Sequence, residues 1–147
     1  MPSNITRGYD PGQVDVNVNG SDVSGYADGT FVKVSRNADQ VTLQVGADGE
    51  STAALSQNRS GRITMTLQQS SPLNDVFSAL SDALEARTGG FVPVIVKDNN
   101  GTTLASAKKA WIVKRPETGF AKEPETREWI FETGNLVLTV GGENEVG

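Results

Sequence analysis

Short segments of alternating polar and apolar residues, separated by tight-turn dipeptides, restrict what this chain can fold into more than any other feature. The turn dipeptides are Asn19-Gly20, Asp28-Gly29, Asp48-Gly49 and Asn100-Gly101. Such pairs tolerate the positive φ values of two-residue hairpin turns. Apolar residues occupy every second position over residues 14–18, 41–45 and 63–67, which predicts strands with one face on a core and one polar face. We therefore expect a mainly β fold, an antiparallel β-sandwich or partial barrel.

One segment has helical periodicity and predicts an amphipathic α-helix over about residues 72–88. Ser71 is the expected N-cap, with Pro72 at the first helical position, and Gly89-Gly90 ends the helix. The apolar stripe, at spacings of three and four, is Leu73, Val76, Phe77, Leu80 and Leu84. The opposite face is expected in solvent and carries Asn74, Ser78, Ser81, Asp82 and Glu85. One such helix cannot bury its stripe alone, so it must lie on the sheet or at its open edge.

The strands after the helix are less regular. Val92 to Val96 is a continuous apolar run, which predicts burial on both faces. Pro93 confines the start of that strand to a sheet edge or to a position without ladder hydrogen bonds. Phe131 and Leu138 have opposite parity, so either a bulge near Gly134 restores a common face or the strand changes the side that it buries.

The 147 residues are expected to form one domain, residues 1–147, long enough to bury a core without disulfides or metals. Within it, four segments are expected to lie outside the packed body: an N-terminal arm (1–12), a hairpin (46–61), a loop (115–126) and a flexible tail (141–147).

Composition excludes much chemistry. The chain has no cysteine, so neither a disulfide framework nor thiol chemistry is available. It also has no histidine, the most frequent general acid–base and metal ligand. A net charge of −5 opposes binding to phosphate backbones and anionic lipid. No basic-then-apolar leader and no run near the ~20 apolar residues of a membrane span is present, so we expect no signal peptide and no membrane partner.

Four groups of residues invite a chemical hypothesis, and each has a plainer structural explanation. Calcium-loop oxygens are present at residues 48–50 and 98–101, but turns also use Asp, Asn and Gly. Solvated surface explains the carboxylates Glu123, Glu125, Glu128 and Glu132. Strand edges explain the scattered basic residues Arg59, Arg62, Lys108, Lys109, Lys114 and Arg115. Core packing is favoured over sugar stacking for Trp111 and Trp129. We therefore predict no catalytic residue, no cofactor and no metal.

The order of these segments resembles that of the tail tube proteins of contractile-tailed bacteriophages. The resemblance covers nearly the whole chain, although each motif is an ordinary turn or strand pattern. The matching segments are residues 23–30 and 41–50, the run 60–67 followed by 71–76 and the helix, and then 96–103, 110–114 and 126–130.

This resemblance implies two packed β-sheets with one helix beside them, and six copies forming a ring around a channel. Stacked rings would then make a tube. The implied partners are further copies of the chain, the tail sheath, and baseplate or terminator proteins. Genomic DNA would pass through without specific binding, since an acidic ring does not retain it. The implied location is the virion tail, assembled in the host cytoplasm.

Two sets of residues become candidate sites under this resemblance. Polar strand faces that would line the channel carry Thr42, Gln44, Thr64, Thr66 and Gln68. Contact between rings is expected first from the hairpin, and then from the N-terminal arm or the 115–126 loop. The hairpin residues expected at this contact are Asp48, Glu50, Ser51, Thr52, Asn58 and Arg59.

Two alternatives remain open from the sequence. A tube-initiating, baseplate or tail-end ring protein would share the fold without forming long tubes. A β-sandwich that binds carbohydrate or peptide through Trp111 or Trp129 would instead be a stable monomer with an exposed tryptophan.

Overall fold

The computed structural model describes residues 5–23 and 31–146, so the predicted turn at Asp28-Gly29 lies outside the described residues. One α-helix, α1 (Leu73–Glu85), and one short 3-10 helix, η1 (Pro11–Gln13), interrupt the strands. The strands are β1 (Thr6–Arg7), β2 (Val14–Val18), β3 (Ser21–Asp22), β4 (Val32–Arg36), β5 (Val41–Val45), β6 (Ser51–Leu55), β7 (Gly61–Gln68), β8 (Val92–Asp98), β9 (Leu104–Lys114), β10 (Thr126–Thr133), β11 (Val137–Thr139) and β12 (Glu145–Val146).

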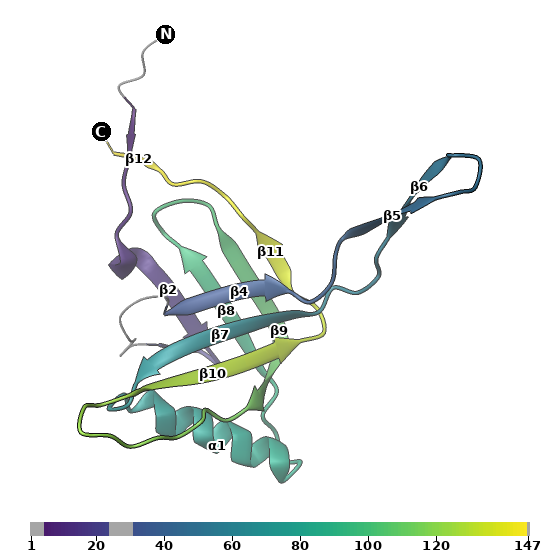
Figure 1. Cartoon of the computed structure of the whole chain (residues 1–147). Coiled ribbons are helices and arrows are strands. Elements are labelled where there is room, and N and C mark those ends of the chain that lie inside the picture. The colour runs from purple at the N-terminus through teal and green to yellow at the C-terminus, as the bar shows by residue number, and fades with distance from the viewer. Residues whose placement is uncertain (1–4, 24–30, 147) are drawn as a thin grey trace.

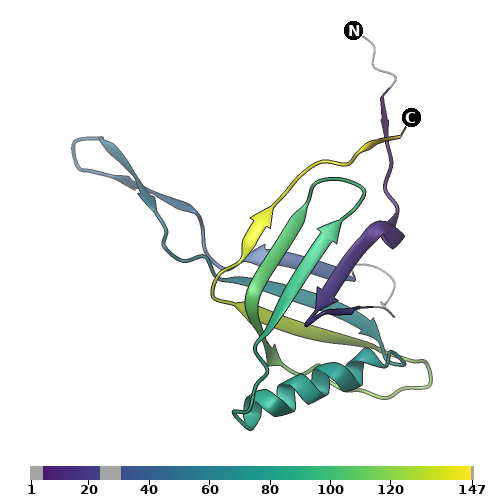
Figure 2. The same ribbon diagram turned by 180° about the vertical axis from the view of Figure 1, so that it is seen from behind.

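The mainly β, antiparallel fold with one helix is confirmed. The body is a single sheet in the order β3-β2-β8-β9-β10-β7-β4, with β11 also pairing to β9. The long strand β9 joins its two halves, because it pairs with β8 and β11 along its first part and with β10 along its last. Figures 1 and 2 show the two halves crossing as layers, with α1 across one end. The layers of the expected sandwich therefore belong to one bent sheet, as in a partial barrel.

The core lies between these layers and follows the predicted alternation on β7. Ile63, Met65 and Leu67 are buried there, while Thr64 and Gln68 face outward. The first hairpin is also as predicted: Val18 pairs with Ser21 across Asn19-Gly20, both with positive φ. Most of the remaining core side chains come from β2, β8, β9, β10 and the helix, and they include Val16, Val18, Val94, Ala105, Ala107, Ala110, Trp129 and Phe131.

The prediction that β8 is buried on both faces is wrong. Val92, Val94 and Val96 are buried, but Pro93 and Ile95 are exposed, because no other described element covers the outer face of this layer. Pro93 lies inside the sheet yet beyond the last pair with β2, where its carbonyl accepts a hydrogen bond from the Asn19 N–H. The missing N–H of Pro93 therefore removes no hydrogen bond between strands. Of the two predicted positions, a sheet edge or a position without ladder hydrogen bonds, the second is the one observed.

Helix α1 is confirmed, with two differences in which residues it buries. Phe77 lies at the centre of the buried face and packs edge-to-face on Trp129 and Phe131, at centroid distances of 5.5 and 5.2 Å. The buried positions are therefore spaced by four, so Ser81, which was expected in solvent, is buried. Val76, which was expected in the stripe, is 46% exposed.

The helix ends differ slightly from the prediction. Pro72 occupies the cap position itself, and the Ser71 hydroxyl accepts from the Leu73 N–H at 3.3 Å. The helix ends at Glu85 rather than near residue 88, and Arg87 adopts a φ of 59° two residues later.

Phe131 and Leu138, which have opposite parity in the sequence, lie on two separate strands. β10 ends at Thr133, Leu136 is fully buried, and β11 then pairs with the first half of β9. The segment for which the sequence predicts a flexible tail, residues 141–147, contains β12, which pairs with β1 of the N-terminal arm. These two end segments extend together from one end of the body (Figure 1).

Candidate assembly interface

The hairpin β5–β6 projects from the body as an arm (Figure 1). Among residues 5–23 and 31–146, its strands pair only with each other, with Val41 opposite Leu55 and Leu43 opposite Ala53. The sequence predicts a core face on residues 41–45, and this is wrong. The apolar and polar residues do alternate. However, the chain leaves the main sheet before residue 41, so the apolar side chains of β5 lie outside the body.

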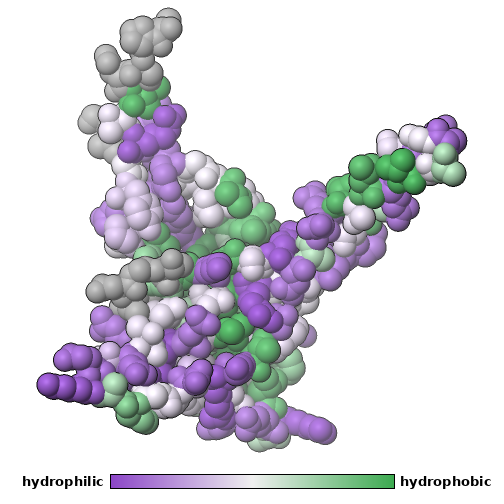
Figure 3. Space-filling model, in the orientation of Figure 1, coloured by the Kyte–Doolittle hydropathy of each residue, from purple (hydrophilic) through white to green (hydrophobic). Residues whose placement is uncertain are grey.

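One face of this hairpin is an exposed apolar surface, which we call the arm face. Leu43 is 68% exposed and Leu55 is 74% exposed. Figure 3 shows a hydrophobic patch on the arm. An isolated two-stranded hairpin is marginal in water, and exposed apolar patches on soluble domains usually mark contacts with partners. The members of the arm face are Val41, Leu43, Val45, Ala53 and Leu55.

Local hydrogen bonds hold the arm at both ends. At the tip, the Gly46 N–H donates to the Glu50 carbonyl at 2.7 Å, and Gly49 supplies the φ of 87° that the turn needs. At the base, the Asn37 amide donates to the Ser60 hydroxyl and to the Glu132 carboxylate, both at 3.1 Å. The arm is thus a formed hairpin fixed to β10.

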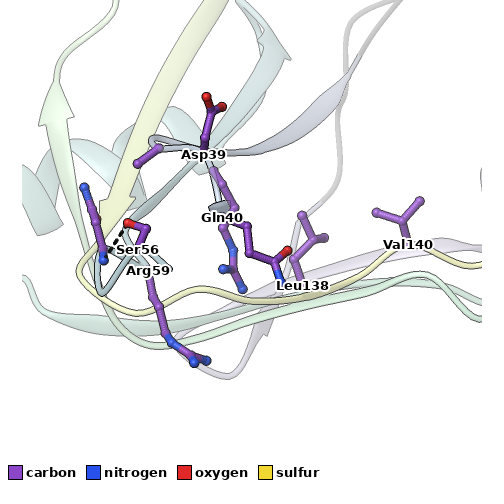
Figure 4. Close-up of a pocket in the computed structure, with 9 residues that line it drawn as sticks. Asp39, Gln40, Ser56, Arg59, Leu138 and Val140 are labelled. Carbon is purple, nitrogen blue, oxygen red and sulfur yellow. Dashed lines mark hydrogen bonds between the residues drawn. The ribbon is translucent and has the colours of Figure 1, made fainter. Parts of the chain in front are cut away.

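A pocket of about 590 Å³ lies at the base of the arm, between the hairpin and the end of β11 (Figure 4). Arg59 and Asp39 give it charges of both signs, and Leu138 and Val140 form an apolar side. The Ser56 hydroxyl in its wall accepts from the Asn58 N–H at 3.1 Å. Its open, mixed lining provides no nucleophile with an adjacent base.

The predicted ring-to-ring residues separate into two groups. Asp48 and Glu50 are in the tip turn, where the Asp48 carboxylate accepts from the Glu50 N–H at 3.1 Å, and Ser51 and Thr52 begin β6 beside it. Asn58 and Arg59 are at the base instead, where they line the pocket.

The predicted channel-lining residues also fall on two elements. Thr64, Thr66 and Gln68 lie on the outward face of β7, beside Lys33 of β4 and Glu128 of β10. Thr42 and Gln44 lie on the arm, on the side opposite the arm face. The structure therefore does not bring the five residues into one surface.

The outward face of β4, β7 and β10 is polar and carries charges of both signs. Arg62 forms an ion pair with Glu132 at 3.7 Å, and Lys33 and Glu128 add one charge of each sign. Within the described residues, β4 pairs only with β7, so its other edge offers unpaired backbone groups to a further strand.

The 115–126 loop is held to the helix and to β10. Arg115 forms ion pairs with Asp82 and Glu85. The Arg127 guanidinium lies 5.5 Å from the Phe120 ring and donates to the Gly119 carbonyl at 3.1 Å. Phe120 itself is 80% exposed at the end of the body opposite the arm.

The chemical candidates acquire no catalytic arrangement. Trp129 is buried, as predicted, and its indole is bonded to Asn74, whereas Trp111 is half-buried against Phe91. Glu132 is paired with Arg62. Within residues 5–23 and 31–146, no group of three or more metal-ligating side chains is placed to hold an ion. No helix in the described part of the chain is long and apolar enough to span a membrane.

One pair of carboxyl groups does interact, near the Asn100 turn. Burial opposes ionisation of Asp98, but hydrogen bonds from the Asn100 side chain and backbone and from Glu143 outweigh it and lower the Asp98 pKa. Burial, the hydrogen bond to Asp98 and the Asp98 charge raise the Glu143 pKa. The pair thus joins the turn after β8 to the C-terminal segment.

Comparison with known proteins shows what kind of protein carries this arm. The profile of the bacteriophage PhiTE tail tube protein family matches residues 9–141. The chain belongs to this tail tube family. A structural protein, ORF10 of Pseudomonas phage KPP10, is 31% identical over 149 residues, covering 96% of this chain and 86% of that protein. The chain is thus a structural protein of the phage virion, of the tail tube or terminator type.

Two solved structures share the fold of this tail tube family member. The tube-terminating cap of the anti-feeding prophage has a TM-score of 0.65 at 7% identity and covers 95% of both chains. A chain of the sheath–tube complex of the PVC extracellular contractile injection system has a TM-score of 0.58 at 12% identity, covering 90% of this chain and 91% of that one.

Proposed function

We propose that this chain is the protomer of a phage tail tube, forming stacked hexameric rings around a channel that conducts DNA. The arm face carries the proposal, because a tail tube family member with an apolar hairpin outside its body needs another surface to cover that hairpin. The edge of β4 that has no partner strand among the described residues supports ring closure, since a neighbour's strand can extend the sheet there.

The arm supplies contact between rings in this proposal. Its tip residues Asp48, Glu50, Ser51 and Thr52 lie farthest from the body and meet the neighbouring ring, whereas Asn58 and Arg59 act at the base. The arm extends beyond the main sheet of its own chain, and no other element in the described part of the chain covers its apolar face. A contact of this kind joins two different surfaces, so it repeats from copy to copy.

The channel is assigned to the outward face of β7, with Thr64, Thr66 and Gln68. Hydroxyl and amide side chains keep water on such a surface, and the neighbouring charges are balanced in sign. This face therefore gives passing DNA no array of cations to bind, and the acidic net charge of each chain adds repulsion. Thr42 and Gln44 lie on the arm, so they would border the channel only if the arm itself reaches it.

The remaining assignments follow from this role. The chain acts as a structural component rather than an enzyme, assembled in the host cytoplasm, with the tail sheath on the outside of the tube and baseplate and terminator proteins at its ends. The fold shared with a subunit of a sheath–tube complex supports the sheath as a partner. The buried indole of Trp129 weighs against a carbohydrate-binding sandwich.

Negative-stain electron microscopy of the purified chain at high concentration, beside light scattering, tests the proposal. Hollow tubes of uniform diameter with six-fold end views are expected. Isolated rings that never stack would instead indicate an initiator or terminator ring of the same fold. A monomer at every concentration would contradict the proposed function.

A further inference from the structure

A second surface of the molecule combines a hollow shape with positive charge, neither of which the arm has. A groove of about 560 Å³ lies where β9 meets the connection between β10 and β11. We call it the β9 groove. Trp111 and Val137 give it apolar walls, and Val137 is 56% exposed. Lys108 and Lys109 give it positive charge, and none of the described residues that line it carries a carboxylate.

A bulge places both lysines in this groove. Ala105 and Ala107 are buried, and the next buried residue is Ala110, so the side-chain alternation shifts by one across Lys108 and Lys109. The pairing of β8 with β9 shifts register at the same place, between Val92 and Val94. An extra residue in one strand re-aims side chains in this way. Two consecutive lysines therefore lie in one exposed surface rather than on opposite faces.

The floor of the groove is fixed by hydrogen bonds. The Thr133 hydroxyl donates to the Lys109 carbonyl at 2.8 Å, and the Asn135 N–H donates to that hydroxyl at 3.3 Å. None of the ion pairs among the described residues uses Lys108 or Lys109. Both ammonium groups are thus available to a partner.

Three other pockets in the described part of the chain do not combine apolar walls with unopposed positive charge. The pocket at the arm base contains Asp39, and the pocket beside the two end segments contains Asp10 and Glu145. The pocket under the 115–126 loop has Arg115 and Arg127, but the first is paired with Asp82 and Glu85 and the second with backbone carbonyls.

The arm is complementary to the β9 groove in both charge and polarity. Residues 38–58 contain Asp39, Asp48 and Glu50 but no lysine or arginine. The same hairpin presents the apolar arm face. It projects away from the body in both views, so it does not cover the groove of its own chain (Figures 1 and 2).

We propose that the arm of one copy docks in the β9 groove of a second copy. The arm face packs on Trp111 and Val137, and the acidic tip pairs with Lys108 and Lys109. The contact joins two different patches, so it does not close on itself within a pair and supports rings or stacks. This inference rests on the proposed tube function and names the surface that receives the arm.

Disulfide trapping tests the docking directly, because the natural chain has no cysteine. Chains carrying Leu43→Cys are mixed with chains carrying Val137→Cys, assembled, and oxidised. A cross-linked heterodimer is expected in high yield. The matched control pairs Leu43→Cys with Val76→Cys, which is also exposed but lies on α1, and should give little product. Equal yields from the two pairs, or tubes without cross-linking, would overturn the docking and leave the tube function standing.

Charge reversal provides a second, independent readout. Lys108→Glu/Lys109→Glu should raise the protein concentration at which assemblies appear by about tenfold or more, and adding Asp48→Lys/Glu50→Lys should restore it. The double control Lys114→Glu/Lys122→Glu should leave that concentration nearly unchanged. Normal assembly by the groove variant would overturn the docking alone. A natural chain that never assembles would overturn the proposed function itself.

Discussion

The indole N–H of Trp129 donates a hydrogen bond to the Asn74 side-chain oxygen at 2.9 Å, joining β10 to the first turn of α1. The amide nitrogen of Asn74 donates in turn to the carbonyls of Gln68, Gln69 and Ser71, at 3.0 to 3.3 Å. One side chain thus satisfies a buried donor and closes the connection between β7 and the helix. This explains how a single helix is fixed on the end of a bent sheet.

Removing that side chain should destabilise the fold. Asn74→Ala leaves the Trp129 N–H without its partner inside the core, so we expect the free energy of unfolding to fall by about 1–3 kcal/mol. Urea denaturation followed by tryptophan fluorescence measures it. Ser78→Ala, one turn along the helix, is the control and should cost well under half as much. Equal losses from both substitutions would show that Asn74 is not the connection described here.

A close approach between Gly61 and Leu136 gives a second prediction. A Cβ on Gly61 would lie 2.8 Å from the Leu136 Cβ and 3.0 Å from the Ser35 carbonyl oxygen, neither of which can move freely. Gly61→Ala should therefore destabilise by about 1–3 kcal/mol through overpacking. Gly134→Ala, where a Cβ meets nothing within 4 Å, should change stability little. Thermal denaturation of the two variants decides the matter, and a harmless Gly61→Ala would contradict this packing.

The Asp98–Glu143 pair predicts a specific dependence on pH. The Glu143 pKa is raised, so between its ordinary value and the raised one the folded chain binds more protons than the unfolded chain, and stability falls as pH rises. Glu143→Gln mimics the protonated form. It should be more stable than the natural chain at neutral pH and equal to it once Glu143 is protonated.

Denaturant unfolding of both proteins across mildly acidic to neutral pH measures this convergence. The Asp98 pKa is lowered, so its own contribution is lost only at more acidic pH, below the window used. Glu117→Gln, in the 115–126 loop, is the control and should track the natural chain at every pH. Parallel curves for the natural chain and Glu143→Gln would refute the coupling.

Features set by local sequence could be predicted here. Asn19-Gly20 specifies its own turn, and the alternation of Ile63, Met65 and Leu67 correctly predicts a half-buried strand. The helical spacing correctly predicts that Phe77 lies on the buried side of α1, because this spacing is a local property of the sequence.

The features that were mispredicted depend on what lies next to a segment in space. Val41, Leu43 and Val45 alternate as a core strand does, and nothing local shows that their hairpin leaves the body. Ile95 is exposed for the same reason, because the run from Val92 to Val96 does not reveal that one face of β8 stays uncovered.

The sequence contains a pattern that indicates the β9 groove. The spacing of Ala105, Ala107, Ala110 and Ile112 breaks parity once, which marks the bulge at Lys108 and Lys109. The interpretation of these lysines as scattered strand-edge residues does not include this break in the alternation. The arm face gave no such signal, since an apolar alternation indicates burial without saying whether the covering surface belongs to the same chain.

If the apolar hairpin outside the body drives assembly, removing its exposed leucines should prevent tubes without unfolding the chain. Leu43→Ser/Leu55→Ser removes two side chains that contact little in the single chain, so its stability should change by no more than about 0.5 kcal/mol. Thr42→Ser/Ala54→Ser, on the opposite side of the same arm, is the matched control.

The decisive measurement is tube formation by the natural chain and these two variants at one concentration, followed by light scattering and negative-stain electron microscopy. Tubes are expected from the natural chain and the control, and folded chains or single rings that do not stack into tubes from Leu43→Ser/Leu55→Ser. Tubes of normal length from Leu43→Ser/Leu55→Ser would contradict this role of the arm.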